Sequence, residues 1–116
     1  MFLGLINLTP PSLQAYANTQ RWFYQVQTTE AIVTAYDAQD FPGEVAAGHK
    51  GIVGTSIACP RSIRLGSMVA IDNKKFSCDD RTAVKYDGRF DLFVATRAEA
   101  LRFGKKEMTV TIFFKR

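Results

Sequence analysis

The chain has 116 residues and a mass of 13.0 kDa, with 47% hydrophobic and 22% charged residues. These values are typical of one globular domain and exclude a disordered, collagen-like or coiled-coil protein. No run of about 18 apolar residues occurs, so no membrane span is expected. Fifteen Lys and Arg against eleven Asp and Glu give a net charge of +4. Because these cations are scattered along the chain, no nucleic-acid partner is expected.

The first 17 residues carry no charged side chain. Small residues at Ala15 and Ala17 resemble a signal-peptidase site. One interpretation is therefore a signal peptide over residues 1–17, with its true start upstream because basic residues are missing before the apolar run. The alternative is an N-terminal arm stiffened by Pro10 and Pro11. The first interpretation predicts a secreted or cell-envelope protein.

Strand patterns dominate from residue 21 onward. Residues 18–30 are expected to form an N-terminal extension or an edge strand, because residues 22–26 are aromatic and β-branched. The barrel domain is expected over residues 31–116. Its apolar segments are bounded by Pro, Gly, Asn and Asp, and they predict strands at 31–36, 52–58, 68–71, 75–79, 90–94 and 107–114.

One short helix is expected before the last strand. Thr96 and Glu99 form a capping box, and Gly104 suits the position after the helix. Its apolar side is expected to consist of Ala98 and Leu101, with Phe103 as a further candidate. Six or seven short strands and a single helix indicate a mainly β protein that folds as a small closed barrel.

Metal and cofactor sites are not expected. Cys59 and Cys78 do not follow a zinc spacing, and His49 is the only histidine. The glycine-rich fingerprints of phosphate-binding loops are absent. Two cysteines are compatible with one disulfide in an exported protein or with two buried thiols.

Carboxylates are the remaining candidates for chemistry. Asp80 follows Phe76 and Cys78 at a period of two, so it is expected to point inward and Asp79 outward. Asp91 begins an apolar strand, where a solvated carboxylate is unusual. Two carboxylates that meet in a partly buried place raise the pKa of one, as a general acid requires.

One other interpretation of Asp80 and Asp91 stays open. Asp80 and Asp91 could instead form structural ion pairs that hold the loop, with cations from the same stretch: Arg81, Lys85 and Arg89. Asp87, followed by Gly88, is expected to serve only as a turn residue.

Several segments of residues 31–114 occur in the order found in one known family. They are TAY at 34–36, GTSIACP at 54–60, IRLGSMV at 63–69, Asp80 to Asp91, the helix motif from Glu99 to Gly104, and VTI at 110–112. Together they resemble the three-aspartate (3D) domain of the rare-lipoprotein-A-like proteins. This resemblance implies a six-stranded double-psi β-barrel, related to the catalytic barrel of the membrane-bound lytic transglycosylase A family.

The resemblance implies cleavage of peptidoglycan glycan strands by a protein that acts as a monomer and without a cofactor. Asp91 would be the general acid and base, and Asp80 would support it, in preference to Asp79. Thr34, Tyr36 and Lys85 would contact the glycan.

The chain departs from the family pattern at Cys59, where the family has its first aspartate, at Arg64, and at residues 81–83, which replace glycines. The change at Cys59 suggests a Cys59–Cys78 disulfide beneath the site, with two free thiols as the alternative. These departures favour a second interpretation, a non-catalytic, expansin-like module that binds peptidoglycan.

Overall fold

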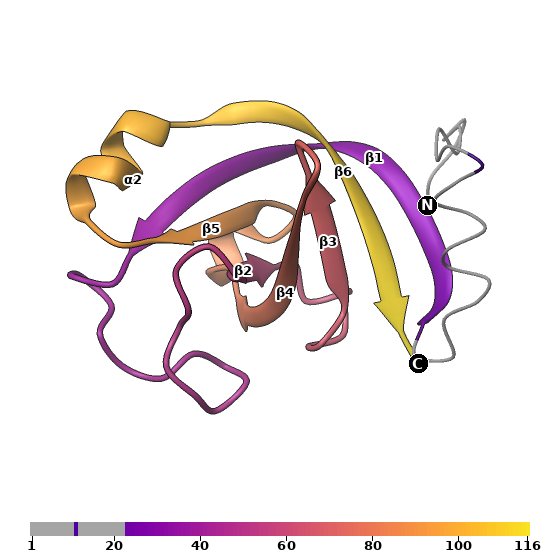
Figure 1. The fold of residues 1–116 in the computed structure, drawn as a ribbon, viewed down its shortest axis with the longest axis horizontal. Helices are drawn as coiled ribbons and strands as arrows, with labels where there is room; N and C mark the ends of the chain where they lie inside the picture. The colour runs from indigo at the N-terminus through magenta and orange to yellow at the C-terminus, as the bar shows by residue number, and fades with distance from the viewer. Residues whose placement is uncertain (1–10, 12–22) are drawn as a thin grey trace.

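The computed structural model describes Pro11 and residues 23–116. The expected signal peptide, apart from Pro11, and residues 18–22 lie outside the described residues. Six strands form a closed barrel in the order β1-β5-β2-β4-β3-β6 (Figure 1). This confirms the expected mainly β class with six strands and one short helix. The strands are β1 (Phe23–Asp37), β2 (Ser56–Cys59), β3 (Met68–Ile71), β4 (Lys74–Arg81), β5 (Phe90–Val94) and β6 (Lys106–Lys115).

Strand β1 is longer than expected. It runs without interruption across the expected boundary at residues 30–31, and it pairs antiparallel with β6 over residues 23–33 and parallel with β5 over 33–37. The prediction of two separate strands was wrong, because the polar residues at 27–30 interrupt the apolar pattern but not the hydrogen-bonded ladder. One long strand therefore connects two sides of the barrel.

Strand β2 begins later than expected. Residues 52–55 form a turn, in which the backbone amides of Thr55 and Ser56 donate to the carbonyl of Ile52 at 3.0 and 2.8 Å. The apolar side chains of Ile52 and Val53 are consequently half exposed. A long connection over residues 38–55 leads from β1 to this turn and projects to one side of the barrel (Figure 1).

The helix α2 (Arg97–Phe103) agrees with the capping box. The Thr96 hydroxyl accepts from the Glu99 amide, and Gly104 ends the helix with a φ of 70°. Part of the expected apolar side was wrong, because Ala98 is exposed and Leu101 is 71% exposed. Phe103 is the expected member that packs against the barrel core. The helix has only two turns, and it rests on the core through its last turn.

The core fills the barrel interior. Its buried side chains come from every strand, among them Val33, Ile57, Val69, Phe90 and Val110. A tight turn at Asp72 and Asn73, both with positive φ, joins β3 to β4. No helix of the described residues is both long and apolar enough to cross a membrane.

Candidate functional site

Four residues lie side by side on the outer wall of the barrel. Thr34 of β1 pairs with Asp91 of β5, Asp91 pairs with Ala58 of β2, and Ala58 pairs with Asp80 of β4. The neighbours Val33, Ile57, Cys59 and Phe90 point into the core. Since strand side chains alternate, Thr34, Ala58 and Asp91 point away from it. Two strand spacings place the Asp80 and Asp91 backbones roughly 10 Å apart, with the small Ala58 side chain between them.

A β-bulge turns Asp80 to this outer wall. Ile57 pairs with Cys78 but the next residue, Ala58, pairs with Asp80, so one extra residue of β4 lies between the two pairs. The expectation that Asp80 points inward with Phe76 and Cys78 was therefore wrong. The bulge shifts the alternation by one position and brings Asp80 into the row that contains Asp91.

Asp79 is the extra residue, and it is buried rather than outward-facing as expected, with 7% exposure. Its carboxylate accepts from the hydroxyls of Ser56 at 2.6 Å and Ser77 at 2.7 Å. His49 lies 3.8 Å away through Nε2, and its side chain is 47% exposed. Because two hydroxyls satisfy the buried carboxylate, Asp79 stabilises the bulge and is a structural group.

Two donors hold the carboxylate of Asp80. The Tyr36 hydroxyl donates to Oδ2 at 3.1 Å, and the Ala46 amide of the 38–55 connection donates to Oδ1 at 3.0 Å. Burial raises the pKa of Tyr36, and the charge of Asp80 raises it further. Tyr36 therefore keeps its proton and remains a hydrogen-bond donor to Asp80.

Asp91 has a different environment. Its Oδ1 accepts a hydrogen bond from the Thr34 hydroxyl. Burial raises the pKa of Asp91 above its ordinary value and the charge of Asp80 also raises it, whereas the Thr34 hydroxyl and the Arg89 charge lower it. The two carboxylates thus interact electrostatically, and Asp91 is the one that binds a proton more readily than a solvated Asp.

Structural ion pairs do not account for the two carboxylates. No cation among residues 23–116 lies within 4.0 Å of the carboxylate of Asp80 or Asp91. Arg81 instead donates to the carbonyls of Pro60, at 3.0 Å, and of Ile63. Cations of this stretch therefore form no close ion pair with these carboxylates, although the charge of Arg89 acts on Asp91 from a longer distance.

A pocket of about 320 Å³ opens beside Asp80, lined by Tyr36, Asp80 and residues 40–45. The Tyr36 ring packs edge-on against Phe93 and Phe41, with centroid distances of 5.0 and 5.7 Å. Gly51 lets the connection approach this cluster, because a Cβ there would lie 2.7 Å from the Phe93 ring. Asp91 does not line the pocket.

The structure brings together four of the five predicted catalytic and contact residues: Thr34, Tyr36, Asp80 and Asp91. Lys85, on the 3-10 helix η1 (Val84–Tyr86), forms no ion pair with the two carboxylates within 4.0 Å. Its ammonium lies 5.0 Å from the centroid of the Tyr86 ring. Sequence reasoning missed the Ala46 amide and the Phe41 ring. Neither carries a sequence signal, since both reach the site only through the path of the 38–55 connection.

Cys59 and Cys78 are joined by a disulfide between β2 and β4, and both are fully buried. Each lies next to a residue of the outer row or its bulge: Cys59 follows Ala58, and Cys78 precedes Asp79. The crosslink therefore ties the two strands together where the bulge turns Asp80 outward.

No protein-family model matches the chain, and no curated protein matches it either.

Proposed function

We propose that the protein cleaves the glycan strands of peptidoglycan in the manner of a lytic transglycosylase, with Asp91 as the general acid and base. The observation that carries the proposal is the row of paired residues on the outer wall of the barrel. In this row Asp91 and Asp80 lie on either side of Ala58, on three neighbouring strands. Two carboxylates with different environments are the usual requirement for glycosidic-bond cleavage. The resemblance to the 3D family, at Asp80 and Asp91 in particular, supports the same assignment.

Asp91 has the properties of a general acid. Its raised pKa favours the protonated form, and its proton would pass to the glycosidic oxygen as the bond from that oxygen to the anomeric carbon breaks. The Asp91 carboxylate would then take the proton of the muramoyl 6-hydroxyl as that oxygen bonds to the anomeric carbon. The product is a 1,6-anhydro ring, Asp91 is protonated again, and no water or cofactor is consumed.

Asp80 would take part in this cycle through its charge and would transfer no proton. The donors from Tyr36 and Ala46 stabilise its negative charge. From its place in the row, that charge would stabilise the positive oxocarbenium character that develops at the anomeric carbon. Because no water attacks, one carboxylate can act as both acid and base, and the absence of an aspartate at Cys59 does not break the cycle.

The disulfide supports a site of action outside the cytoplasm. Disulfides form and persist in oxidising compartments, and the Cys59–Cys78 bond lies beneath the proposed site. Secretion or export to the cell envelope, where peptidoglycan lies, is therefore part of the proposal.

A second candidate is a non-catalytic module that binds the same glycan. It is favoured by the pocket, which contains Asp80 and the rings of Tyr36 and Phe41 but not Asp91. Polar groups beside aromatic rings suit a sugar ligand without any reaction.

The two candidates separate in an assay on purified peptidoglycan sacculi. Asp91→Asn keeps the acceptor for the Thr34 hydroxyl but removes the transferable proton, so we expect release of anhydro-muropeptides to fall by about 100-fold or more. Asp87→Asn is the matched control, since Asp87 is exposed and its carboxylate accepts from the Arg61 amide rather than from a residue of the row. Wild-type protein that binds sacculi and releases nothing would identify the binding module.

A further inference from the structure

The connection from β4 to β5 carries two cations on one aromatic ring. The Arg89 guanidinium carbon lies 4.8 Å from the centroid of the Tyr86 ring, and the Lys85 ammonium lies 5.0 Å from it. Tyr86 is itself 44% exposed and Lys85 is exposed. Cation–π contact holds both charges in place at the surface. We refer to Lys85, Tyr86 and Arg89 as the Tyr86 cation cluster.

The cluster forms no ion pair within the described part of the chain. No carboxylate of residues 23–116 lies within 4.0 Å of either cation. Asp87, the acidic residue between them, instead accepts from the Arg61 amide at 2.9 Å. Two surface cations that are ordered by a ring but not neutralised can bind an external anion.

Arg89 links the cluster to the general acid. Arg89 precedes Asp91 by two residues at the start of β5, and its charge acts on the Asp91 carboxyl. The opposite side of the row is acidic, because the pocket beside Asp80 is also lined by Asp40 and Glu44. A ligand that crosses the row would therefore meet positive charge on the Asp91 side and negative charge on the Asp80 side.

We infer that the Tyr86 cation cluster binds a carboxylate of the peptide stem carried by the sugar on the Asp91 side. The inference rests on the proposed function, because that function places a muramoyl sugar at Asp91. It gives the site a preference for stem-bearing glycan over glycan stripped of its peptides.

Binding can be measured without cleavage by co-sedimentation of Asp91→Asn protein with sacculi. In that background, Lys85→Gln should weaken binding to stem-bearing sacculi by about two- to five-fold, as expected for a surface ion pair. The difference should vanish on glycan stripped of stems by an amidase, and in about 1 M salt, where the Debye length is about 3 Å. Tyr86→Leu, which removes the ring, should have the same effect.

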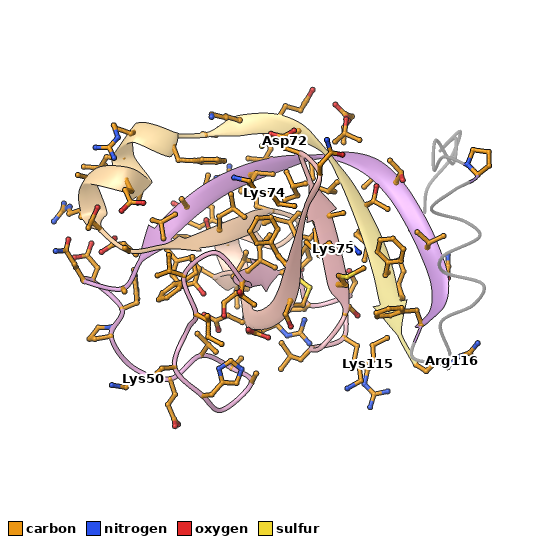
Figure 2. The ribbon with its side chains drawn as sticks, viewed as in Figure 1. Lys50, Asp72, Lys74, Lys75, Lys115 and Arg116 are labelled. Carbon is orange, nitrogen blue, oxygen red and sulfur yellow. A yellow bond between two sulfur atoms is a disulfide. The ribbon has the colours of Figure 1, made fainter. Side chains whose placement is uncertain are left out.

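Lys74→Gln is the matched control, because Lys74 is an exposed cation at the β3–β4 turn (Figure 2), at the opposite end of β4 from this connection. Equal losses on stem-bearing and stripped glycan, or a loss that Lys74→Gln shares, would overturn the inference. The inference would also be overturned if the cluster variants still bind stripped glycan more weakly than the Asp91→Asn protein does, and this difference disappears once hydrofluoric acid has removed the phosphate polymers. Stem-dependent binding without any cleavage by wild-type protein would support the cluster and contradict only the proposed catalysis.

Discussion

Asp80 and Asp91 pair with the same residue, Ala58, from opposite sides of strand β2. This relationship follows from the bulge at Asp79, since an unbroken ladder would turn Asp80 into the barrel. The two carboxylates then differ through their donors: Asp80 receives two hydrogen bonds, from Tyr36 and Ala46, and Asp91 receives one from Thr34. The charge of Asp80 raises the pKa of Asp91 and the Thr34 hydroxyl lowers it, so substitutions of Asp80 and Thr34 should have effects of opposite sign.

Asp80→Asn should lower the pKa of Asp91. The negative charge of Asp80 disfavours the ionised form of Asp91, and the amide removes that charge with little change of shape. A carbon-detected NMR titration of the Asp91 carboxyl measures the effect directly. An unchanged midpoint would show that the two groups do not interact.

Thr34→Val should shift the same titration in the opposite direction. The Thr34 hydroxyl stabilises the ionised form of Asp91, and valine has the same shape without the donor. The pKa of Asp91 should therefore rise, and the alkaline limb of any Asp91-dependent activity should move to higher pH. A shift to lower pH would mean that Thr34 accepts a hydrogen bond from a protonated Asp91.

Asp91→Asn should stabilise the fold at neutral pH. The folded state raises the pKa of Asp91, so it binds a proton more tightly than the unfolded chain, and stability falls as pH rises from the unfolded value near 4 through the folded value. Asparagine removes that penalty and still accepts from Thr34. Thermal unfolding should show a higher Tm for the variant at pH 7 and no gain at pH 3, whereas a lower Tm at pH 7 would contradict the prediction.

Loss of the disulfide should destabilise the protein by about 3 kcal/mol, because a crosslink between residues 19 positions apart restricts the unfolded chain. Urea unfolding of the Cys59→Ala/Cys78→Ala variant, compared with wild-type protein, measures the difference. Reductant should move the wild-type midpoint toward that of the variant and leave the variant unchanged. Equal midpoints for all samples would mean that the bond contributes no stability.

Gly51→Ala should disturb the aromatic side of the pocket. The new Cβ would meet the Phe93 ring at 2.7 Å, and overpacking of this kind typically costs about 1–3 kcal/mol. Gly43→Ala is the control within the same connection, because nothing lies within 4 Å of its Cβ position. Equal stability of the two variants would show that the connection moves freely away from Phe93.

Local sequence signals were sufficient for the regular elements. The residues of β3 and β5 match their predicted ranges, and Thr96, Glu99 and Gly104 mark the ends of α2. These predictions succeed because apolar runs bounded by turn residues, and helix caps, act within a few positions of the chain.

The orientation of Asp80 could not be predicted in the same way. A bulge depends on which residues of β2 pair with β4. These two strands are neighbours in the barrel, but the whole of β3 lies between them in the sequence. Alternation within β4 alone therefore placed Asp80 and Asp79 on the wrong sides. The preference for Asp80 over Asp79 rests on an inward orientation of Asp80, which the structure contradicts. Asp80 is nevertheless the residue that shares a row with Asp91.

The contribution of the 38–55 connection was also beyond local reasoning. It brings the Ala46 amide to Asp80, which is 34 residues away in the chain. It also brings the Phe41 ring back against Tyr36 at the end of β1. Its four glycines and single proline predict a loop but not the side of the barrel against which the loop folds.

Analysis of the products that wild-type protein releases from purified sacculi tests the proposed chemistry most directly. We expect muropeptides that end in an anhydro ring, each one water lighter than a hydrolysis product, and no such products from the Asp91→Asn protein. Muropeptides with ordinary reducing ends, or sacculi that remain intact while the protein stays bound to them, would contradict the assignment of Asp91 as the acid and base of a transglycosylase.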